Sequence, residues 1–372
     1  MNSEMEQELF CAGCGVALQS IEPKQVGYTP ASAMEKEIPI CQRCYRIKHY
    51  NEASTVTLGD DEYLRILNQI GDTRALVVQV VDLFDFDGSW LRGLPRLVGG
   101  NPILLAVNKV DLLPKNINRN RLLNWIRKSA SEYGIKPVDV VLLSAKKGIG
   151  MEEFVRSIDQ HRKGKNVYIV GVTNVGKSSL INRLLKQYGD VDMEITTSQF
   201  PGTTLDVIEI PIDNHSSLFD TPGIVNRDQL IHQVSPQEYK FILPDKPIKP
   251  KVYQLMDKQS LFIGALARVD FVRGERQPFV FYISNELNIH RTKLEKADEL
   301  YEKHKGELLT PPHGEGIKDL SPFHKFSFKV PAGKYDVVIS GLGWIALHGS
   351  GANVEVHVPK GTTASLRPSL IS

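Results

Sequence analysis

The sequence predicts a chain of the α/β class, with a small cysteine module before a central α/β domain and a mostly β domain after it. Apolar runs of strand length alternate with amphipathic segments of helix length over residues 53–234. All four cysteines lie within the first 44 residues, and short β-type runs separated by Gly and Pro fill much of the C-terminal third. We therefore expect domains at residues 1–52, 53–234 and 235–372.

The composition is that of a folded protein, with 41% apolar and 24% charged residues. The formal net charge of +2 is too small to indicate a nucleic-acid partner, so any such site must be a local patch. The apolar runs are too short to span a bilayer, and residues 1–6 lack the basic and apolar regions of a secretory signal. We expect a cytoplasmic monomer without a membrane or DNA partner.

The four cysteines are spaced C-x2-C-x26-C-x2-C, at Cys11, Cys14, Cys41 and Cys44. Two residues between thiolates allow one turn to place both sulfurs on one ion, and two such turns complete a tetrahedron. Four thiolates select Zn²⁺ or an iron–sulfur cluster over hard cations. Two disulfides or a redox C-x-x-C are the alternatives, and a cytoplasmic location disfavours the disulfides. We expect a structural zinc site.

The central region reads as alternating helices and strands. An amphipathic helix is expected at 60–70, and strands are expected at 75–82, 103–107, 138–143 and 167–170. Helices are expected around 122–130 and 154–158, followed by strands at 207–212 and around 218–219.

Residues 171–178 read G-x-x-x-x-G-K-S, between the strand at 167–170 and helical apolar spacing at 180–185. That context predicts a phosphate-binding P-loop, in which backbone amides and the helix N-terminus face the negative charge. Lys177 is expected to reach the β- and γ-phosphates, and the Ser178 hydroxyl to ligate Mg²⁺. The loop residues expected at the nucleotide are Asn174, Val175, Gly176, Lys177, Ser178 and Ser179.

Asn108-Lys109-Val110-Asp111 follows the strand at 103–107. The Asp111 carboxylate can accept from guanine N1–H and the exocyclic amine, donors that adenine lacks, so a site of this kind can reject adenine by roughly 10⁴-fold or more. Asn108 is expected to hold the loop and meet the base, and the Lys109 stem to pack along the ring.

The strand after this motif ends in Ser144-Ala145-Lys146, where the Ala145 amide is expected to contact guanine O6. Each motif alone is a weak match. Together with the P-loop they predict GTP or GDP as the ligand.

Two switch motifs follow the P-loop. In Pro201-Gly202-Thr203-Thr204, Thr204 is expected to close over the γ-phosphate and Mg²⁺, with Thr203 as the alternative. In Asp220-Thr221-Pro222-Gly223, Asp220 is expected to bind Mg²⁺ through water, and the Gly223 amide to meet the γ-phosphate. The catalytic set expected is Lys177, Thr204, Asp220 and Gly223.

The five motifs are those of translation-factor-like GTPases, in the order 4-5-1-2-3. The chain resembles a circularly permuted GTPase. With its four-cysteine module and long C-terminal domain it is similar to the YqeH family, bacterial relatives of a plant organelle protein once taken for a nitric oxide synthase. The resemblance implies a GTPase that assists assembly of the small (30S) ribosomal subunit through the particle or its rRNA.

One position departs from many GTPases, which have a water-orienting Gln after the D-x-x-G motif. Here it is Ile224, so we expect slow intrinsic hydrolysis. Relatives with Asn at the position of Asn174 use it to hold K⁺ beside the phosphates, where a cation can act as an arginine finger does. The alternative role for Asn174 is loop stabilisation.

The C-terminal region is expected to be mostly β, with strands at 261–272, 279–283, 325–330, 337–339, 344–348 and 354–358. A helix is expected at 292–304, opened by Thr292 and Glu295 in capping-box spacing. Residues 240–276 carry eight Lys/Arg against four Asp/Glu, with aromatics between them. This pattern suits RNA backbone contact and base stacking, or an ordinary solvated sheet face with aromatics in its core.

Two functions follow from these expectations. The first is a slow GTPase switch that binds ribosomal RNA or a pre-ribosomal particle. The second is a GTP-dependent regulator of a protein partner, without direct RNA binding.

Overall fold

The computed structural model describes residues 9, 17–23, 27–34, 36, 39, 41–42, 57–58, 60–115, 117–188, 196–199 and 206–371. The chain divides into two compact units. Unit 1 comprises residues 1–82, 91–109 and 127–225, and unit 2 comprises residues 83–90, 110–126 and 226–372. Two short segments from the central region of the sequence, 83–90 and 110–126, therefore cluster with the C-terminal residues.

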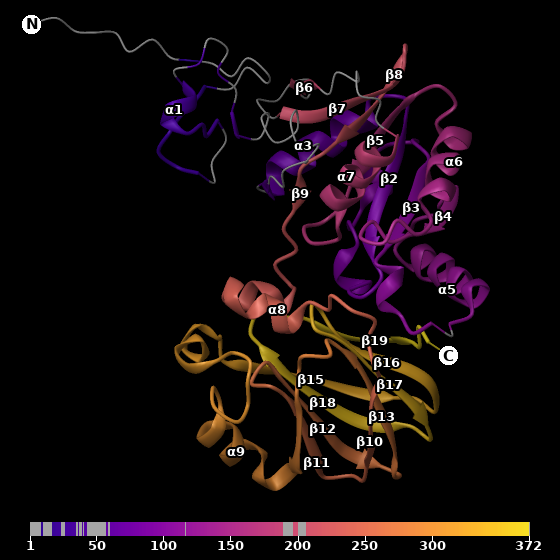
Figure 1. Cartoon of the computed structure of the whole chain (residues 1–372). Coiled ribbons are helices and arrows are strands. Elements are labelled where there is room, and N and C mark those ends of the chain that lie inside the picture. The colour runs from indigo at the N-terminus through magenta and orange to yellow at the C-terminus, as the bar shows by residue number, and fades with distance from the viewer. Residues whose placement is uncertain are drawn as a thin grey trace, which may run out of the picture. The chain divides into compact units, whose positions relative to one another are not determined.

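Unit 1 contains a seven-stranded sheet in the order β4-β3-β2-β5-β8-β7-β6 (Figure 1). Its parallel strands are β2 (Ala75–Asp82), β3 (Ile103–Asn108), β4 (Asp139–Leu142), β5 (Asn166–Val170) and β8 (Ser216–Asp220). Strands β7 (Asp206–Asp213) and β6 (Thr196–Gln199) continue the sheet antiparallel. Every residue of β2 and β3 is buried, as expected for parallel strands covered on both faces.

The main helices of the central region are α3 (Asp60–Gly71), α5 (Arg119–Glu132), α6 (Met151–Arg162) and α7 (Lys177–Tyr188). Short helices lie at η1 (Asp87–Ser89), α4 (Leu94–Leu97) and η2 (Val110–Leu112). On α3 the residues Tyr63, Ile66, Leu67 and Ile70 are all buried, so the amphipathic pattern predicted at 60–70 is confirmed. The strands predicted at 75–82, 103–107, 138–143 and 167–170 are confirmed to within a residue or two.

The cysteine module lies largely outside the described residues. Cys11, Cys14 and Cys44 are among those not described, and so are Thr203 and Thr204. Cys41 is described and its side chain is buried. A single helical turn, α1 (Ala31–Met34), is described in this region. A two-residue strand, β1 (Thr57–Leu58), pairs in parallel with β9 (Gly223–Ile224).

Unit 2 is built on two five-stranded antiparallel sheets. The first has the order β10-β13-β17-β16-β19, and the second has the order β14-β11-β12-β18-β15. The strands are β10 (Lys251–Leu255), β11 (Gln259–Ile263), β12 (Ala267–Gly274), β13 (Gln277–Ile283), β14 (Ile289–Lys293), β15 (Phe323–Val330), β16 (Gly333–Ile339), β17 (Gly343–Gly349), β18 (Ala352–Pro359) and β19 (Ala364–Pro368).

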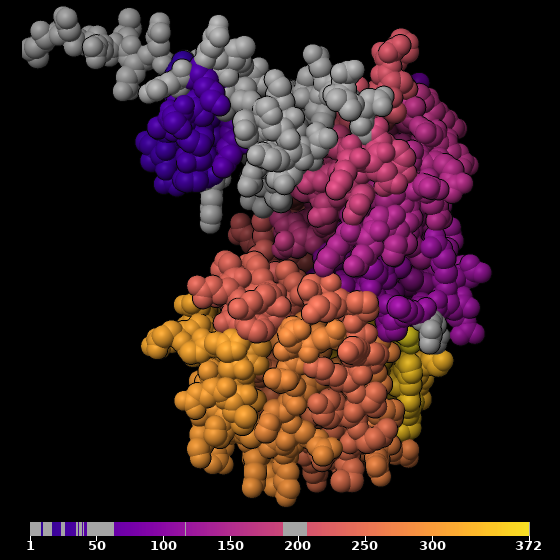
Figure 2. Space-filling model, viewed as in Figure 1, coloured from indigo at the N-terminus to yellow at the C-terminus, as the bar shows by residue number. Residues whose placement is uncertain are grey.

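The two sheets share one apolar core. Phe271 and Val356 enter it from the second sheet, and Phe281 and Ile345 enter it from the first. The salmon, orange and yellow atoms of these strands pack as one solid body in Figure 2. The C-terminal part of unit 2 also contains the short helices η3 (Leu230–Gln233), η4 (Pro236–Glu238), α8 (Tyr239–Ile242) and η5 (Leu294–Lys296), besides α9 (Ala297–His304) and η6 (Gly314–Asp319).

Segments 83–90 and 110–126 are held in unit 2 by specific contacts. The Asp85 carboxylate accepts from Gln229 Nε2 at 2.6 Å and from the Gly341 amide at 3.0 Å. The Arg367 guanidinium lies 5.1 Å from the ring centre of Trp125 and 5.6 Å from that of Trp344, and it also pairs with Asp87. These cation–π and charged contacts fix both segments to the β strands.

Two predictions for this region are wrong in part. The run at 261–272 is two strands, β11 and β12, because Gly264 adopts a φ of +53° and the chain turns over residues 264–266. The helix predicted at 292–304 begins only at Ala297, after β14 and η5. Thr292 therefore belongs to a strand, and its spacing from Glu295 caps no helix.

Within the described part of the chain, no helix combines the length and apolar character needed to cross a membrane.

Replacing Phe271 by Ala should destabilise unit 2 by about 3–5 kcal/mol, because its side chain is fully buried in the shared core. All three tryptophans, Trp90, Trp125 and Trp344, belong to unit 2, so tryptophan fluorescence during urea unfolding reports on this unit. Val252→Ala is the matched control, since 58% of that side chain is exposed. Equal urea midpoints for the two variants would contradict the assigned core.

Candidate nucleotide site

The glycine-rich loop lies between the end of β5 and the start of α7 (Figure 1). Gly176 has a φ of +87°, and a Cβ added there would lie 2.3 Å from Asn108 Nδ2. A glycine is therefore required on two grounds, its left-handed backbone and the close approach of Asn108. The loop delivers the chain into the first turn of α7, whose free amides suit an anion.

Lys177 is the first residue of α7, and its side chain is buried with that of Asp220 at the end of β8. Its ammonium donates to Asp220 Oδ1 and to the Thr221 carbonyl. The structure thus brings together the cation predicted for the phosphates and the carboxylate predicted for the metal. Ser178 follows in the same helical turn and is partly exposed.

The loop is also tied to the strand that carries the second switch. The Thr173 amide donates to the Ile224 carbonyl at 2.7 Å, and Val172 bridges to Ile224. Gly223 is buried, and a Cβ placed there would lie 3.5 Å from Thr173 Cγ2. A movement of the D-x-x-G segment would therefore shift the P-loop backbone directly.

Asn108 joins the guanine-motif loop to two others. Its Nδ2 donates to the Val175 carbonyl at 2.9 Å, and its Oδ1 accepts from the Ala145 amide at 3.0 Å. The side chain is buried. The Ala145 amide, predicted to meet guanine O6, is thus engaged with Asn108 in this structure.

Lys109 adopts a left-handed backbone with a φ of +68°. Its ammonium donates to the Asn174 carbonyl at 2.8 Å and to Asp82 Oδ2 at 2.5 Å. The Lys109 side chain therefore contacts the P-loop backbone, while the packing of its stem along the guanine ring stays a prediction. Asp111 lies two residues further along, in η2 and within the segment that belongs to unit 2.

Asn174 has a φ of +66°, and its side chain is exposed. Asn is the residue type, after Gly, that best tolerates this backbone region. The loop-stabilising role considered for this residue thus has a physical basis in the structure. An exposed amide oxygen is equally available to a cation.

Arg183, in α7, is a further residue of the site, and none of the sequence motifs includes it. Its Nε donates to the Ala145 carbonyl at 2.9 Å, and its Nη2 donates to the Lys146 carbonyl at 2.8 Å. The Ser144 hydroxyl accepts from the Lys147 amide at 3.1 Å in the same loop. The helix that follows the P-loop therefore holds the 144–147 loop, and no sequence pattern marks an arginine on a polar helix face for such a task.

Two other residues near the P-loop, Tyr63 and Asp82, belong to none of the sequence motifs. Tyr63, on α3, is almost fully buried beside Gly171 and Thr221, and this burial raises the pKa of its phenol. Asp82 closes β2 and receives the Lys109 ammonium.

Comparison with known proteins agrees with this geometry. A family model described as "50S ribosome-binding GTPase" matches residues 166–257, and a "YqeH-like, C-terminal" model matches residues 276–370. The protein is a P-loop GTPase, which binds and hydrolyses GTP with Mg²⁺.

The chain is 52% identical to "Uncharacterized protein YqeH" of Bacillus subtilis over 365 residues, covering 98% of this chain and 100% of that one. It is 29% identical to "NO-associated protein 1, chloroplastic/mitochondrial" of Arabidopsis thaliana, covering 97% and 76% of the two chains. The crystal structure of GNP-bound YlqF from T. maritima matches with 19% identity over 47% of this chain and 65% of that one, with a TM-score of 0.31. The chain belongs to the YqeH family.

Arg183→Met should weaken GTP and GDP binding by about three- to tenfold, because two hydrogen bonds to the 144–147 loop are lost while the apolar stem remains. Titration with a fluorescent guanine nucleotide measures the effect. Lys186→Met, an exposed position on the same helix, is the control. Unchanged affinity in Arg183→Met would show that this loop is held by other contacts.

Proposed function

We propose that this GTPase is a slow switch that assists assembly of the small (30S) ribosomal subunit through contact with the particle or its RNA. The nucleotide-dependent switch is supported by the gathering of Lys177, Asn108 and the 144–147 loop around one P-loop. The ribosomal role is supported by the family resemblance. The family relationship supports a GTPase, and the printed name of the matched GTPase model refers to the 50S ribosome, so both subunits belong in the test.

We also propose that the GTPase domain is circularly permuted. The strands that carry the guanine motifs, β3 and β4, precede the P-loop strand in the chain, yet β5 lies in the middle of the sheet between β2 and β8. This order supports the arrangement 4-5-1-2-3. The domain limits proposed remain 1–52, 53–234 and 235–372.

The proposed roles of the site residues follow from the five GTPase motifs. Lys177 and the Gly223 amide contact the γ-phosphate, while Ser178, Asp220 and Thr204 or Thr203 hold Mg²⁺. Asn108, Lys109, Asp111 and the 144–146 loop receive the guanine. Cys11, Cys14, Cys41 and Cys44 hold Zn²⁺, which the zinc content of the purified chain tests.

The particle test uses Asp111→Asn. An amide in place of the carboxylate can donate to the 2-carbonyl of xanthine but offers no second acceptor to guanine, so the variant should lose GTP by about 100-fold or more and accept xanthosine triphosphate. The wild type should cosediment with small subunits in a GTP analogue. The variant should do so only with the xanthosine analogue, and Asp319→Asn serves as a control for a surface carboxylate.

Binding to large subunits alone would remove the small-subunit assignment. Nucleotide-dependent binding to no particle would favour the second candidate, a GTP-dependent regulator of a protein partner. Measured turnover with and without particles shows whether the ribosome accelerates the slow hydrolysis that Ile224 implies.

The potassium role of Asn174 has its own test. Hydrolysis should be faster in K⁺ than in Na⁺ or Li⁺, because a bound cation can stabilise the transition-state charge. Asn174→Gly keeps the left-handed backbone that the loop requires, while removing the amide oxygen. The K⁺ stimulation should be lost in this variant with GTP affinity retained; equal rates in K⁺ and Na⁺ for the wild type would refute the role.

A further inference from the structure

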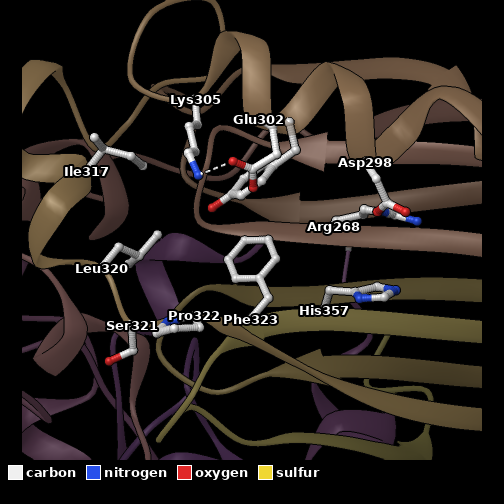
Figure 3. A pocket seen from close by; sticks show the side chains of 11 residues that line it. Arg268, Asp298, Glu302, Lys305, Ile317, Leu320, Ser321, Pro322, Phe323 and His357 are labelled. Atoms are coloured by element: carbon white, nitrogen blue, oxygen red, sulfur yellow. Dashed lines mark hydrogen bonds and ion pairs between the residues drawn. The ribbon is translucent and has the colours of Figure 1, made fainter.

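A cavity of about 430 Å³ lies in unit 2, and no residue of the nucleotide motifs lines it. It is formed by α9, the chain before β15 and the strands β12 and β18 (Figure 3). Its size is within the range that takes a large side chain or a small ligand. The residues that line it are Arg268, Asp298, Tyr301, Glu302, Lys305, Ile317, Leu320, Ser321, Pro322, Phe323 and His357.

The interior of the cavity is aromatic. Phe262 stacks on Tyr301 with ring centres 5.9 Å apart, and Tyr301 contacts Phe323 at 4.8 Å. Figure 3 shows the Phe323 ring at the centre of the cavity, with Ile317 and Leu320 to one side. Tyr301 and Phe323 both remain partly exposed. A surface of this kind favours an apolar or aromatic side chain.

The cations around the cavity are already engaged. Arg268 donates from Nε and Nη2 to Asp270 at 2.7 Å each, and from Nη1 to Asp298. Burial alone would raise the pKa of Asp270, but the hydrogen bonds from His357 and Arg268 hold it below its ordinary value. His357 Nε2 lies 2.9 Å from Asp270.

Lys305 is paired in the same way, with Glu302 at 2.6 Å. The cavity therefore offers no uncompensated cation among its lining residues to a phosphate group.

The charge that faces solvent is negative. Asp298 and Glu302 are the ion-pair partners of Arg268 and Lys305, yet their side chains remain 93% and 68% exposed, so both carboxylates can also contact a group that arrives from solvent. Residues 294–319, which include five of the lining residues, carry seven Asp/Glu against four Lys/Arg. Residues 240–276, in the same unit, carry the opposite balance. The charge around the cavity thus disfavours nucleic acid and favours a cationic occupant.

The cavity also adjoins a sheet edge. Phe323 is the first residue of β15, which stands at the end of its sheet and pairs with β18 among the described strands. An edge strand can accept an extended peptide as an added strand.

We propose that this cavity binds an extended, basic segment of a partner protein and takes one large apolar side chain onto the Tyr301–Phe323 surface. Lys and Arg residues flanking that side chain face Asp298 and Glu302. The site requires neither bound nucleotide nor a ribosomal partner, so it stands apart from the function proposed above.

Selection from phage-displayed random dodecapeptides on the full-length chain tests the proposal. The selected peptides should share one aromatic or large aliphatic residue flanked by Lys or Arg. Replacing that residue by Ala in a synthetic peptide should weaken binding by about 10- to 100-fold, because a fully buried large apolar side chain is lost. Failure to enrich any peptide, or enrichment of acidic ones, would overturn the proposal.

A matched pair of variants on α9 tests whether the selected peptide binds in the cavity. Glu302→Lys reverses an exposed charge at the cavity, and Glu299→Lys reverses an exposed charge on the same helix outside the lining. The first should weaken the selected peptide by at least about threefold and the second should leave it unchanged. Equal effects, or displacement of the peptide by oligouridylate, would show that the peptide binds elsewhere or that the cavity belongs to RNA.

Discussion

The nucleotide site depends on the buried side chain of Asn108. It connects the strand that carries the guanine motif to the P-loop through the Val175 carbonyl, and to the 144–147 loop through the Ala145 amide. An amide is suited to this because it donates from one atom and accepts at the other, so both buried backbone groups are satisfied by one side chain. Aspartate would leave the Val175 carbonyl without a donor, and a shorter side chain would reach neither loop.

This one contact imposes conditions on its neighbours. Because Asn108 Nδ2 occupies the space beside Gly176, that position can carry no Cβ. The left-handed turn there then directs α7 so that Lys177 meets Asp220 and Arg183 meets the carbonyls of Ala145 and Lys146. Loops from separate parts of the chain are thus held in one arrangement by hydrogen bonds from side chains, mostly to backbone groups. A phosphate and a base can be bound together only if these loops keep this arrangement.

The residues of the nucleotide-binding motifs can be identified from the sequence, whereas the residues that hold these motifs in place cannot. Lys177, Asp220 and Asn108 each belong to a short motif with a fixed spacing of residues. Their roles could therefore be predicted from the sequence alone. Arg183 and Tyr63 contact residues far along the chain and belong to no spacing. The β14–α9 boundary was misplaced because Thr292 and Glu295 satisfy a local capping rule, whereas pairing of Thr292 with Ser260 in the sheet decides its conformation. Tertiary pairing outweighs local preference there.

The presence of isoleucine directly after the D-x-x-G motif is explained by the strand in which this residue lies. Ile224 lies in β9, where its carbonyl accepts from the Thr173 amide and its backbone pairs with Leu58. A β-branched residue suits a strand, and an aliphatic side chain makes no competing hydrogen bond with these backbone groups. A side chain chosen for this strand cannot also orient a water for hydrolysis. If intrinsic hydrolysis is slow, as proposed above, the group that accelerates the reaction must come from the P-loop, from a bound cation or from a partner. The segment around Ile224 instead connects the second switch to the phosphate loop through its backbone.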